Sequence, residues 1–267
     1  MPEASSLEKF VIVDTSVVCP ECEYPFATPS LLSMPNPDRN TPVEADLHRV
    51  LPHPSVRAAL IAMCPSCRYA WWLAAFKPHH YLPVLLVPAP EVGFSKKFGF
   101  AMLEGRKHNE TMLDLALLAL NGAWCAREEV EAGLCEHKEV QRWLKLAARE
   151  LEAAMSDSSW RGNTARYTYI LSEILRQMGD FTNAANRLQT LDSSCLLPRE
   201  LIDHQLAMCN ARTAEPTLLP PHLVEEIFKL KPIVEEADSE PEIPYVPTEE
   251  EIQALLKEIE NPTPMAR

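Results

Sequence analysis

Apolar residues recur at helical spacing through the middle of the chain. No proline occurs between residues 91 and 197, and apolar side chains return there every three or four positions, as on one face of an α-helix. Because an interior proline breaks a helix, this segment favours long helices. With the part that follows, the pattern predicts helices near residues 109–128, 143–154, 164–178, 181–191, 198–212 and 221–230.

Residues 1–90 follow a different pattern. Fourteen of the 24 prolines lie in this part, whereas all seven glycines lie between Gly93 and Gly179. Since proline cannot donate a ladder hydrogen bond, we expect only short strands, turns and irregular segments here. The whole chain is predicted to be mainly α, with a small module at 1–90, a helical domain at 91–231 and an acidic, proline-rich remainder at 232–267.

The remainder begins as a linker, because its composition cannot bury enough apolar surface to fold alone. Thr248 then begins a capping-box sequence, which predicts a short amphipathic helix. Four apolar residues share one stripe of this helix and are candidate partner-binding residues: Ile252, Leu255, Leu256 and Ile259. Docking within the chain and a solvated tail are the alternatives.

The predicted hairpin at 164–191 resembles one tetratricopeptide unit. The shared features are the turn Met178-Gly179-Asp180-Phe181 and apolar or small residues at packing positions, namely Leu171, Ala184, Leu188 and Leu191. Ser172 and Leu175 depart from the glycine and tyrosine of the repeat. We therefore expect a tetratricopeptide-like helical domain.

Charge narrows the classes of partner. The net charge is −13, and residues 225–267 contribute −8 of it through twelve acids and four bases. A polyanionic partner would be repelled over much of the surface, so nucleic acid is disfavoured. No signal peptide or membrane-spanning run is recognisable, which predicts a cytoplasmic protein without a membrane partner.

Two Cys-Pro-x-Cys turns carry the clearest chemistry. Cys19, Cys22, Cys64 and Cys67 supply four thiolates, the donor set of a closed tetrahedral zinc site. The 41 residues between the turns exceed the usual spacing, but loop-closure entropy rises slowly with length. The alternative, a thioredoxin-like redox pair, needs one active motif in a βαβ context. We therefore expect one structural Zn²⁺. Because four cysteines leave no open ligand position and no catalytic motif is recognisable, we also expect that the protein is not an enzyme.

The surroundings of the cysteines leave several alternatives. Glu23 and Arg68 follow the second cysteine of each turn, where a left-handed backbone is often needed. Four histidines are either solvated or accessory ligands: His48, His53, His79 and His80. An aromatic run either packs the module onto the first helices or forms a binding surface: Tyr69, Trp71, Trp72 and Phe76. The cysteines outside the turns, Cys125, Cys135, Cys195 and Cys209, are predicted core residues.

Several of these segments together resemble an uncharacterised bacterial family, domain of unknown function 2225. The similar segments are the two cysteine turns, Asp46-Leu47-His48, the 52–54 region and Arg176-Gln177-Met178-Gly179-Asp180-Phe181. The resemblance covers residues 15–195 and implies a zinc ribbon joined to tetratricopeptide-like helices, with no established activity. Glu23 and Arg68 stand where that family has glycine.

Two functions follow as hypotheses. The first is a zinc-binding adaptor that binds a protein partner through its helical domain or its C-terminal helix. The second is a nucleic-acid-associated zinc ribbon, which would require Arg39, Arg49, Arg57 and Lys77 to cluster in space.

Overall fold

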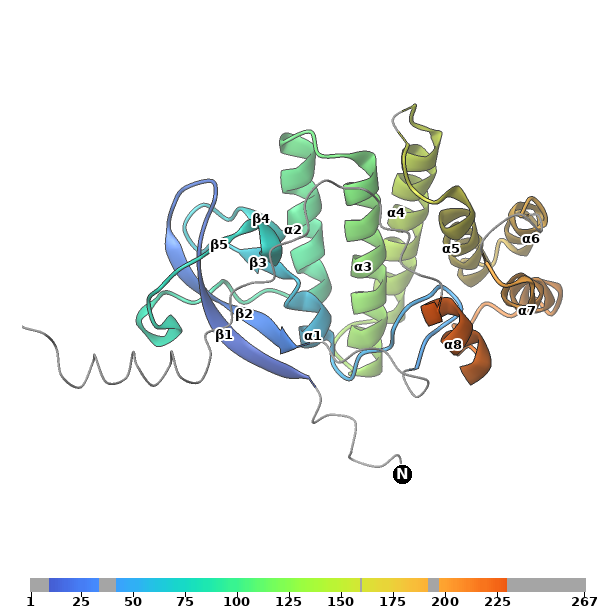
Figure 1. The fold of residues 1–267 in the computed structure, drawn as a ribbon, viewed down its shortest axis with the longest axis horizontal. Coiled ribbons are helices and arrows are strands. Elements are labelled where there is room, and N and C mark those ends of the chain that lie inside the picture. The colour runs from blue at the N-terminus through green and yellow to red at the C-terminus, as the bar shows by residue number, and fades with distance from the viewer. Residues whose placement is uncertain (1–9, 34–41, 159, 192–196, 230–267) are drawn as a thin grey trace, which may run out of the picture.

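The computed structural model describes residues 10–33, 42–158, 160–191 and 197–229, and within them the chain is mainly α-helical. Figure 1 shows helices α2 to α5 standing side by side, with the strands gathered at one end of this row. The helices are α1 (Pro54–Ala58), α2 (Phe94–Lys107), α3 (Met112–Glu131), α4 (His137–Ser156), α5 (Thr164–Gln177), α6 (Phe181–Gln189), α7 (Arg199–Asn210) and α8 (Pro221–Lys229). The stripe predicted at Ile252, Leu255, Leu256 and Ile259 lies outside the described residues.

Two antiparallel hairpins form the strand region. The first pairs β1 (Val11–Val18) with β2 (Pro25–Ser33), and β5 (Lys77–Pro78) pairs with the other side of β1. The second pairs β3 (Ile61–Met63) with β4 (Ala70–Trp72). The first hairpin is longer than the short strands predicted for this proline-rich part. As an edge strand, β2 needs a partner on one side only, so it tolerates two prolines.

All six predicted helices are present as α3 to α8, but the prediction missed α1 and α2. Two glycines weaken the helical signal of α2. One of them has a packing reason: a Cβ on Gly105 would lie 2.8 Å from the Trp71 ring and 2.9 Å from Leu115. The glycine therefore lets α2 approach both β4 and α3 closely.

The α5–α6 hairpin turns where the sequence predicted. Gly179 has a φ of 84°, which favours glycine, and the Asp180 side chain caps α6 by accepting from the backbone N–H of Asn183 (3.3 Å). The predicted packing positions are buried, namely Leu171, Ala184, Leu188 and Leu191. Assignment of the hairpin to the tetratricopeptide class stays a prediction.

One hydrophobic core runs through the strand region and the helices. It extends from Phe26 and Ile61 through Phe98 and Leu118 to Leu171. Trp71 is buried, and the Trp72 ring lies edge-on to Phe98, with centroids 6.4 Å apart. The aromatic run therefore packs the strands onto α2, as the first of its two interpretations has it.

Candidate metal centre

Both cysteine turns lie at the tips of the hairpins, and their backbones are alike. Cys19 follows β1, and its N–H donates to the carbonyl of Tyr24 (3.1 Å) while the Glu23 N–H donates to the Cys19 carbonyl (2.9 Å). The second turn repeats the pattern after β3, with Cys64 N–H to Tyr69 (2.8 Å) and Arg68 N–H to Cys64 (3.1 Å). Each turn thus presents two sulfurs from a closed backbone loop.

Glu23 and Arg68 have φ angles of 57° and 67°, so both adopt the left-handed conformation that the sequence predicted. An L-residue with a Cβ costs about 1–2 kcal/mol there relative to glycine. Both turns keep this strain, which indicates that the closed geometry is imposed by interactions stronger than the local backbone preference.

The four sulfurs gather into one cluster. Their Sγ atoms all lie within 4.8 Å of one another, with Cys19–Cys67 at 3.7 Å and Cys22–Cys64 at 3.6 Å. A disulfide would place two sulfurs about 2.05 Å apart, so these pairs are not disulfides. Zn–S bonds of about 2.3 Å in a tetrahedron place sulfurs about 3.8 Å apart, which matches both separations. The donor set and its geometry fit a metal site.

The cluster is half inside the protein. Cys19 and Cys64 are buried, whereas Cys22 and Cys67 are exposed. Burial raises the pKa of the Cys19 thiol well above its ordinary value and also raises that of Cys67. Burial acts the same way on Cys22, but hydrogen bonds from the Tyr24 backbone and from neighbouring thiols outweigh it and lower its pKa to about 7.

Aromatic side chains hold the turns against the helices. The Phe26 and Phe76 rings lie edge-on, with centroids 5.8 Å apart, and Tyr69 contacts both Phe76 (5.7 Å) and His108 at the end of α2 (5.8 Å). These contacts fix the position of the sulfur cluster beside α2.

The four candidate histidines stay outside the sulfur cluster. His53 caps α1 and His79 accepts a hydrogen bond from the Tyr81 N–H. His48 was predicted to be solvated or an accessory ligand, and the first of these interpretations is wrong. It is only 2% exposed, and its ring bonds Glu44 and Glu128 instead.

His48 belongs to a second cluster of possible ligands, together with Glu44 and Asp46. A tight turn brings the three together: Leu47 has a φ of 63°, and the His48 N–H donates to Asp46 Oδ1 (3.1 Å). The Glu44 carboxyl lies 2.5 Å from His48 Nδ1. All three side chains are buried.

One guanidinium group, that of Arg127, contacts the carboxylates of this cluster, and a second, that of Arg57, contacts the neighbouring Glu128. Arg127 of α3 bonds Asp46 and lies 3.0 Å from Glu44, while Trp124 donates its indole N–H to Asp46 (2.9 Å). Arg57 of α1 bonds Glu128 through Nε (3.0 Å) and Nη2 (2.9 Å). The cluster is therefore the centre of a buried ion network, and its carboxylates are already engaged.

Protonation of Glu44 helps to match the numbers of positive and negative charges in this network. Burial raises the pKa of Glu44 to about 8, even though Arg127 opposes the shift, so the protonated carboxyl is the favoured form at neutral pH. Burial and the nearby Arg57 and Arg127 hold the pKa of His48 well below its ordinary range. A neutral Glu44 can donate to His48 Nδ1, and the ring N–H at Nε2 can then donate to Glu128 (3.0 Å). The pairs Arg127–Asp46 and Arg57–Glu128 remain, each electrically neutral.

A third buried pair continues the network toward the C-terminal helices. Arg176 and Glu173 are both fully buried in α5, with Nη2 and Oε1 2.5 Å apart. Arg176 also donates to the carbonyls of Thr213 and Glu215 (2.9 Å to the latter). The arginine of the Arg-Gln-Met-Gly-Asp-Phe segment thus fastens the chain between α7 and α8.

Backbone bonds reinforce the same junction. The Ala45 N–H donates to the Thr217 carbonyl (2.8 Å), and the Leu219 N–H donates to the Val43 carbonyl (2.8 Å). The segment between the two cysteine turns is therefore held by α3 on one side and by residues 217–219 on the other. No pattern in the sequence predicted this junction.

The four basic residues that the nucleic-acid hypothesis requires differ in exposure. Arg57 is buried in the ion network, Arg49 is half-buried, and Arg39 lies outside the described part. Of the four candidates, Lys77 alone is exposed within that part.

Comparison with known proteins gives no relative from which a role could be transferred. No protein-family model, no curated protein and no solved structure matches the chain. The resemblance to domain of unknown function 2225 stays a prediction. Among the described helices, none has the length and apolar character needed to cross a membrane.

Proposed function

We propose that the protein is a zinc-stapled scaffold that binds a protein partner through the surface beside its cysteine turns. Four thiols at tetrahedral separations support zinc as the ion, because zinc is the usual occupant of closed Cys₄ sites. Such a site has no open position for a substrate or an activated water, so its role is to hold the two hairpins together. The free thiols of the described residues fit the reducing cytoplasm.

The observation that carries the binding role is an exposed apolar ridge. We define the apolar ridge as Tyr81, Leu82, Val84, Leu85 and Val87. Val84 is 85% exposed, Leu85 74% and Tyr81 63%. Single exposed apolar residues are common on soluble proteins, but a contiguous exposed run indicates an interaction site.

The ridge is held in place on the first hairpin. The Ala27 N–H of β2 donates to the Val87 carbonyl (3.0 Å), and the Ala89 N–H donates back to the Ala27 carbonyl (2.7 Å). At the other end, Ser16 of β1 donates its hydroxyl to the Tyr81 carbonyl (2.5 Å). A segment fixed at both ends loses little conformational entropy on binding. We infer that the partner offers an apolar groove that receives Val84 and Leu85.

The tail stripe at Ile252, Leu255, Leu256 and Ile259 stays a second candidate for partner binding. Nucleic-acid binding is the weaker alternative, since the net charge is −13 and Arg57 is withdrawn into the interior. A tetratricopeptide-like helical domain fits the adaptor role, because such domains commonly present binding surfaces.

Affinity purification with a matched control tests the proposal. We expect the double variant Val84→Asp, Leu85→Asp to lose specific partners that the native chain retains, identified by mass spectrometry. Leu134→Asp is the control, because Leu134 is also an exposed apolar residue (56%) but lies between α3 and α4. Recovery of the same partners by the double variant, with zinc content unchanged, would remove the ridge from the proposal.

A further inference from the structure

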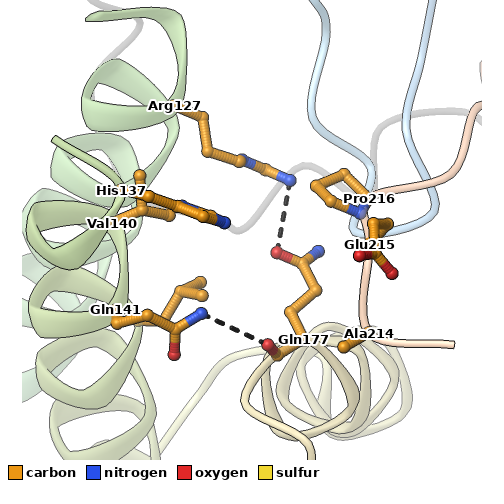
Figure 2. A pocket seen from close by; sticks show the side chains of 9 residues that line it. Arg127, His137, Val140, Gln141, Gln177, Ala214, Glu215 and Pro216 are labelled. Carbon is orange, nitrogen blue, oxygen red and sulfur yellow. Dashed lines mark hydrogen bonds between the residues drawn. The ribbon is translucent and has the colours of Figure 1, made fainter. Parts of the chain in front are cut away.

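A small polar pocket lies beside the ion network, and Arg127 belongs to both. It has a volume of about 90 Å³ and opens between α3, the first turns of α4, the end of α5 and the chain before α8 (Figure 2). Its lining residues are Arg127, His137, Val140, Gln141, Leu144, Gln177, Ala214, Glu215 and Pro216. Ligand pockets for whole metabolites are several times larger, about 300–1,000 Å³, so this one fits a single side-chain group.

Arg127 brings an unused donor to this pocket. Its two terminal nitrogens bond Asp46, Glu44 and Gln177, but within the described part of the chain its Nε has no hydrogen-bond partner. Arg127 is buried, and Figure 2 shows it reaching from α3 into the space facing Gln177. A buried donor without an acceptor costs about 1–3 kcal/mol, so the pocket favours an occupant with an acceptor atom.

The other polar groups of the pocket add both donors and acceptors. Gln177 is engaged, because it accepts from Arg127 (3.3 Å) and donates to Glu173 (3.1 Å). Gln141 uses one amide hydrogen on the Gln177 carbonyl (3.4 Å), which leaves its second hydrogen and its oxygen. Glu215 is an exposed acceptor at the rim. An occupant that both accepts and donates satisfies these groups together.

Charge decides between a carboxylate and its neutral analogue. The positive charge of Arg127 is already matched by Asp46, and Glu131 and Glu173 add negative charge near Glu44. A carboxylate in the pocket would share it with the carboxylate of Glu215, and two like charges at one site disfavour each other. A carboxamide has the same shape, offers its oxygen to Arg127 Nε, and offers its N–H groups to Gln141 and Glu215.

We propose that this pocket binds the carboxamide of an asparagine or glutamine side chain presented by a protein partner. The site is separate from the apolar ridge, so either contact can fail without the other. Because the lining spans α3, α4, α5 and residues 214–216, an occupant would also stabilise the junction that the ion network forms.

An isosteric pair of probes tests the proposal on the full chain. N-acetylglutamine methylamide and N-acetylglutamate methylamide are titrated while the arginine Nε–H signals are followed by NMR. We expect the glutamine probe to shift the Arg127 signal saturably, with an affinity at least about tenfold above that of the glutamate probe, a difference of 1.4 kcal/mol. The Nε–H signals of Arg57 and Arg176, which are bonded elsewhere, report that the fold is intact.

Two variants sharpen the outcome. Gln141→Leu keeps the side-chain size and removes one donor, so we expect a several-fold weaker glutamine affinity, whereas Gln189→Leu at the exposed end of α6 should leave it unchanged. Equal or tighter binding of the glutamate probe would overturn the proposal in favour of an anion site. No saturable shift with either probe would overturn it in favour of a pocket filled by water.

Discussion

The sulfur cluster and the buried ion network both fasten distant parts of the chain, but by opposite means. The sulfur cluster joins two hairpin tips near the surface, and two of its four cysteines are exposed. The ion network joins the segment at 44–48 to α1 and α3 deep inside the protein. A metal ion can hold the sulfur cluster together. The ion network is stable only when each buried charged side chain has a partner of opposite charge. One fold therefore combines a local cross-link with a network of charges spread over several elements.

The largest expected effect comes from breaking the sulfur cluster. Cys64→Ser removes one buried thiolate, and because zinc contributes about 10–16 kcal/mol in small modules, we expect the hairpins to lose their fixed structure. Metal analysis should give one zinc per native chain and none for the variant, with loss of near-ultraviolet circular dichroism. Cys135→Ser lies outside the cluster and should change neither. Unaltered zinc and stability in Cys64→Ser would contradict the metal centre.

Breaking the ion network should have the next largest effect. Arg127→Met leaves Asp46 buried without its counter-charge, which costs about 3–5 kcal/mol. Urea denaturation measures this change, and zinc content should stay at one per chain. Arg142→Met is the matched control, because its pair with Glu139 is exposed and worth no more than about 1 kcal/mol. Equal losses in the two variants would show that the network does not stabilise the fold.

Because the folded state favours a protonated Glu44, we expect a smaller effect, a change of stability with pH. Its folded pKa is raised from 4.5 to about 8, so between these values the folded chain holds a proton that the unfolded chain has released. Stability from this group therefore falls as pH rises from 4.5 to 8, by up to about 1.4 kcal/mol for each pH unit. The groups acting on it are Arg127, Asp46, Glu131 and Glu173, with His48 in direct contact.

Glu44→Gln mimics the protonated carboxyl and removes this contribution. Urea midpoints from pH 5 to pH 8 should fall less steeply for the variant than for the native chain, and the two curves should diverge most at pH 8. Parallel curves would show that Glu44 is ionised throughout the range.

The smallest expected effect concerns the strain in the cysteine turns. Glu23→Gly relieves a left-handed residue worth about 1–2 kcal/mol, offset by about 0.5–1 kcal/mol of added chain entropy. We expect a net gain near 1 kcal/mol, or roughly 2–4 °C in melting temperature. Glu21→Gly in the same turn has no positive φ to relieve and should lower the melting temperature. A lower melting temperature for Glu23→Gly would show that the Glu23 side chain contributes more than the strain costs.

The helices and the sulfur cluster could be predicted because their signals are local. Periodic apolar residues mark α3 to α8, and two cysteines three positions apart mark each turn. The same reasoning placed Glu23 and Arg68 in the left-handed region. The prediction missed helix α2 because Gly105 lowers helix propensity. The packing of Gly105 against Trp71, which explains the glycine, is a long-range contact that the neighbouring residues do not indicate.

The ion network could not be predicted, because its members are scattered and charged residues normally lie at the surface. Arg57, Arg127 and Arg176 stand in three helices with nothing local to mark them as buried. Two segments of the sequence contain members of the network, namely Asp46-Leu47-His48 and the segment around Arg176. Both were noted only for their resemblance to a family, which does not predict their contacts. The pairing of each acidic residue with an arginine depends on the tertiary fold.

The bonds between residues 43–45 and 217–219 set an order for assembly. Ribosomes deliver the N-terminal part first, and both cysteine turns are complete once residue 68 has emerged. The partners of Val43 and Ala45 at Leu219 and Thr217 arrive about 170 residues later, and such long-range contacts form slowly. A nascent chain can therefore acquire its metal while Glu44, Asp46 and His48 still await α3 and the C-terminal segment. Metal binding therefore precedes burial of the charged residues. A shortage of zinc would affect the chain while it is being synthesised, whereas substitution of an arginine in the ion network would affect it only when synthesis is nearly complete.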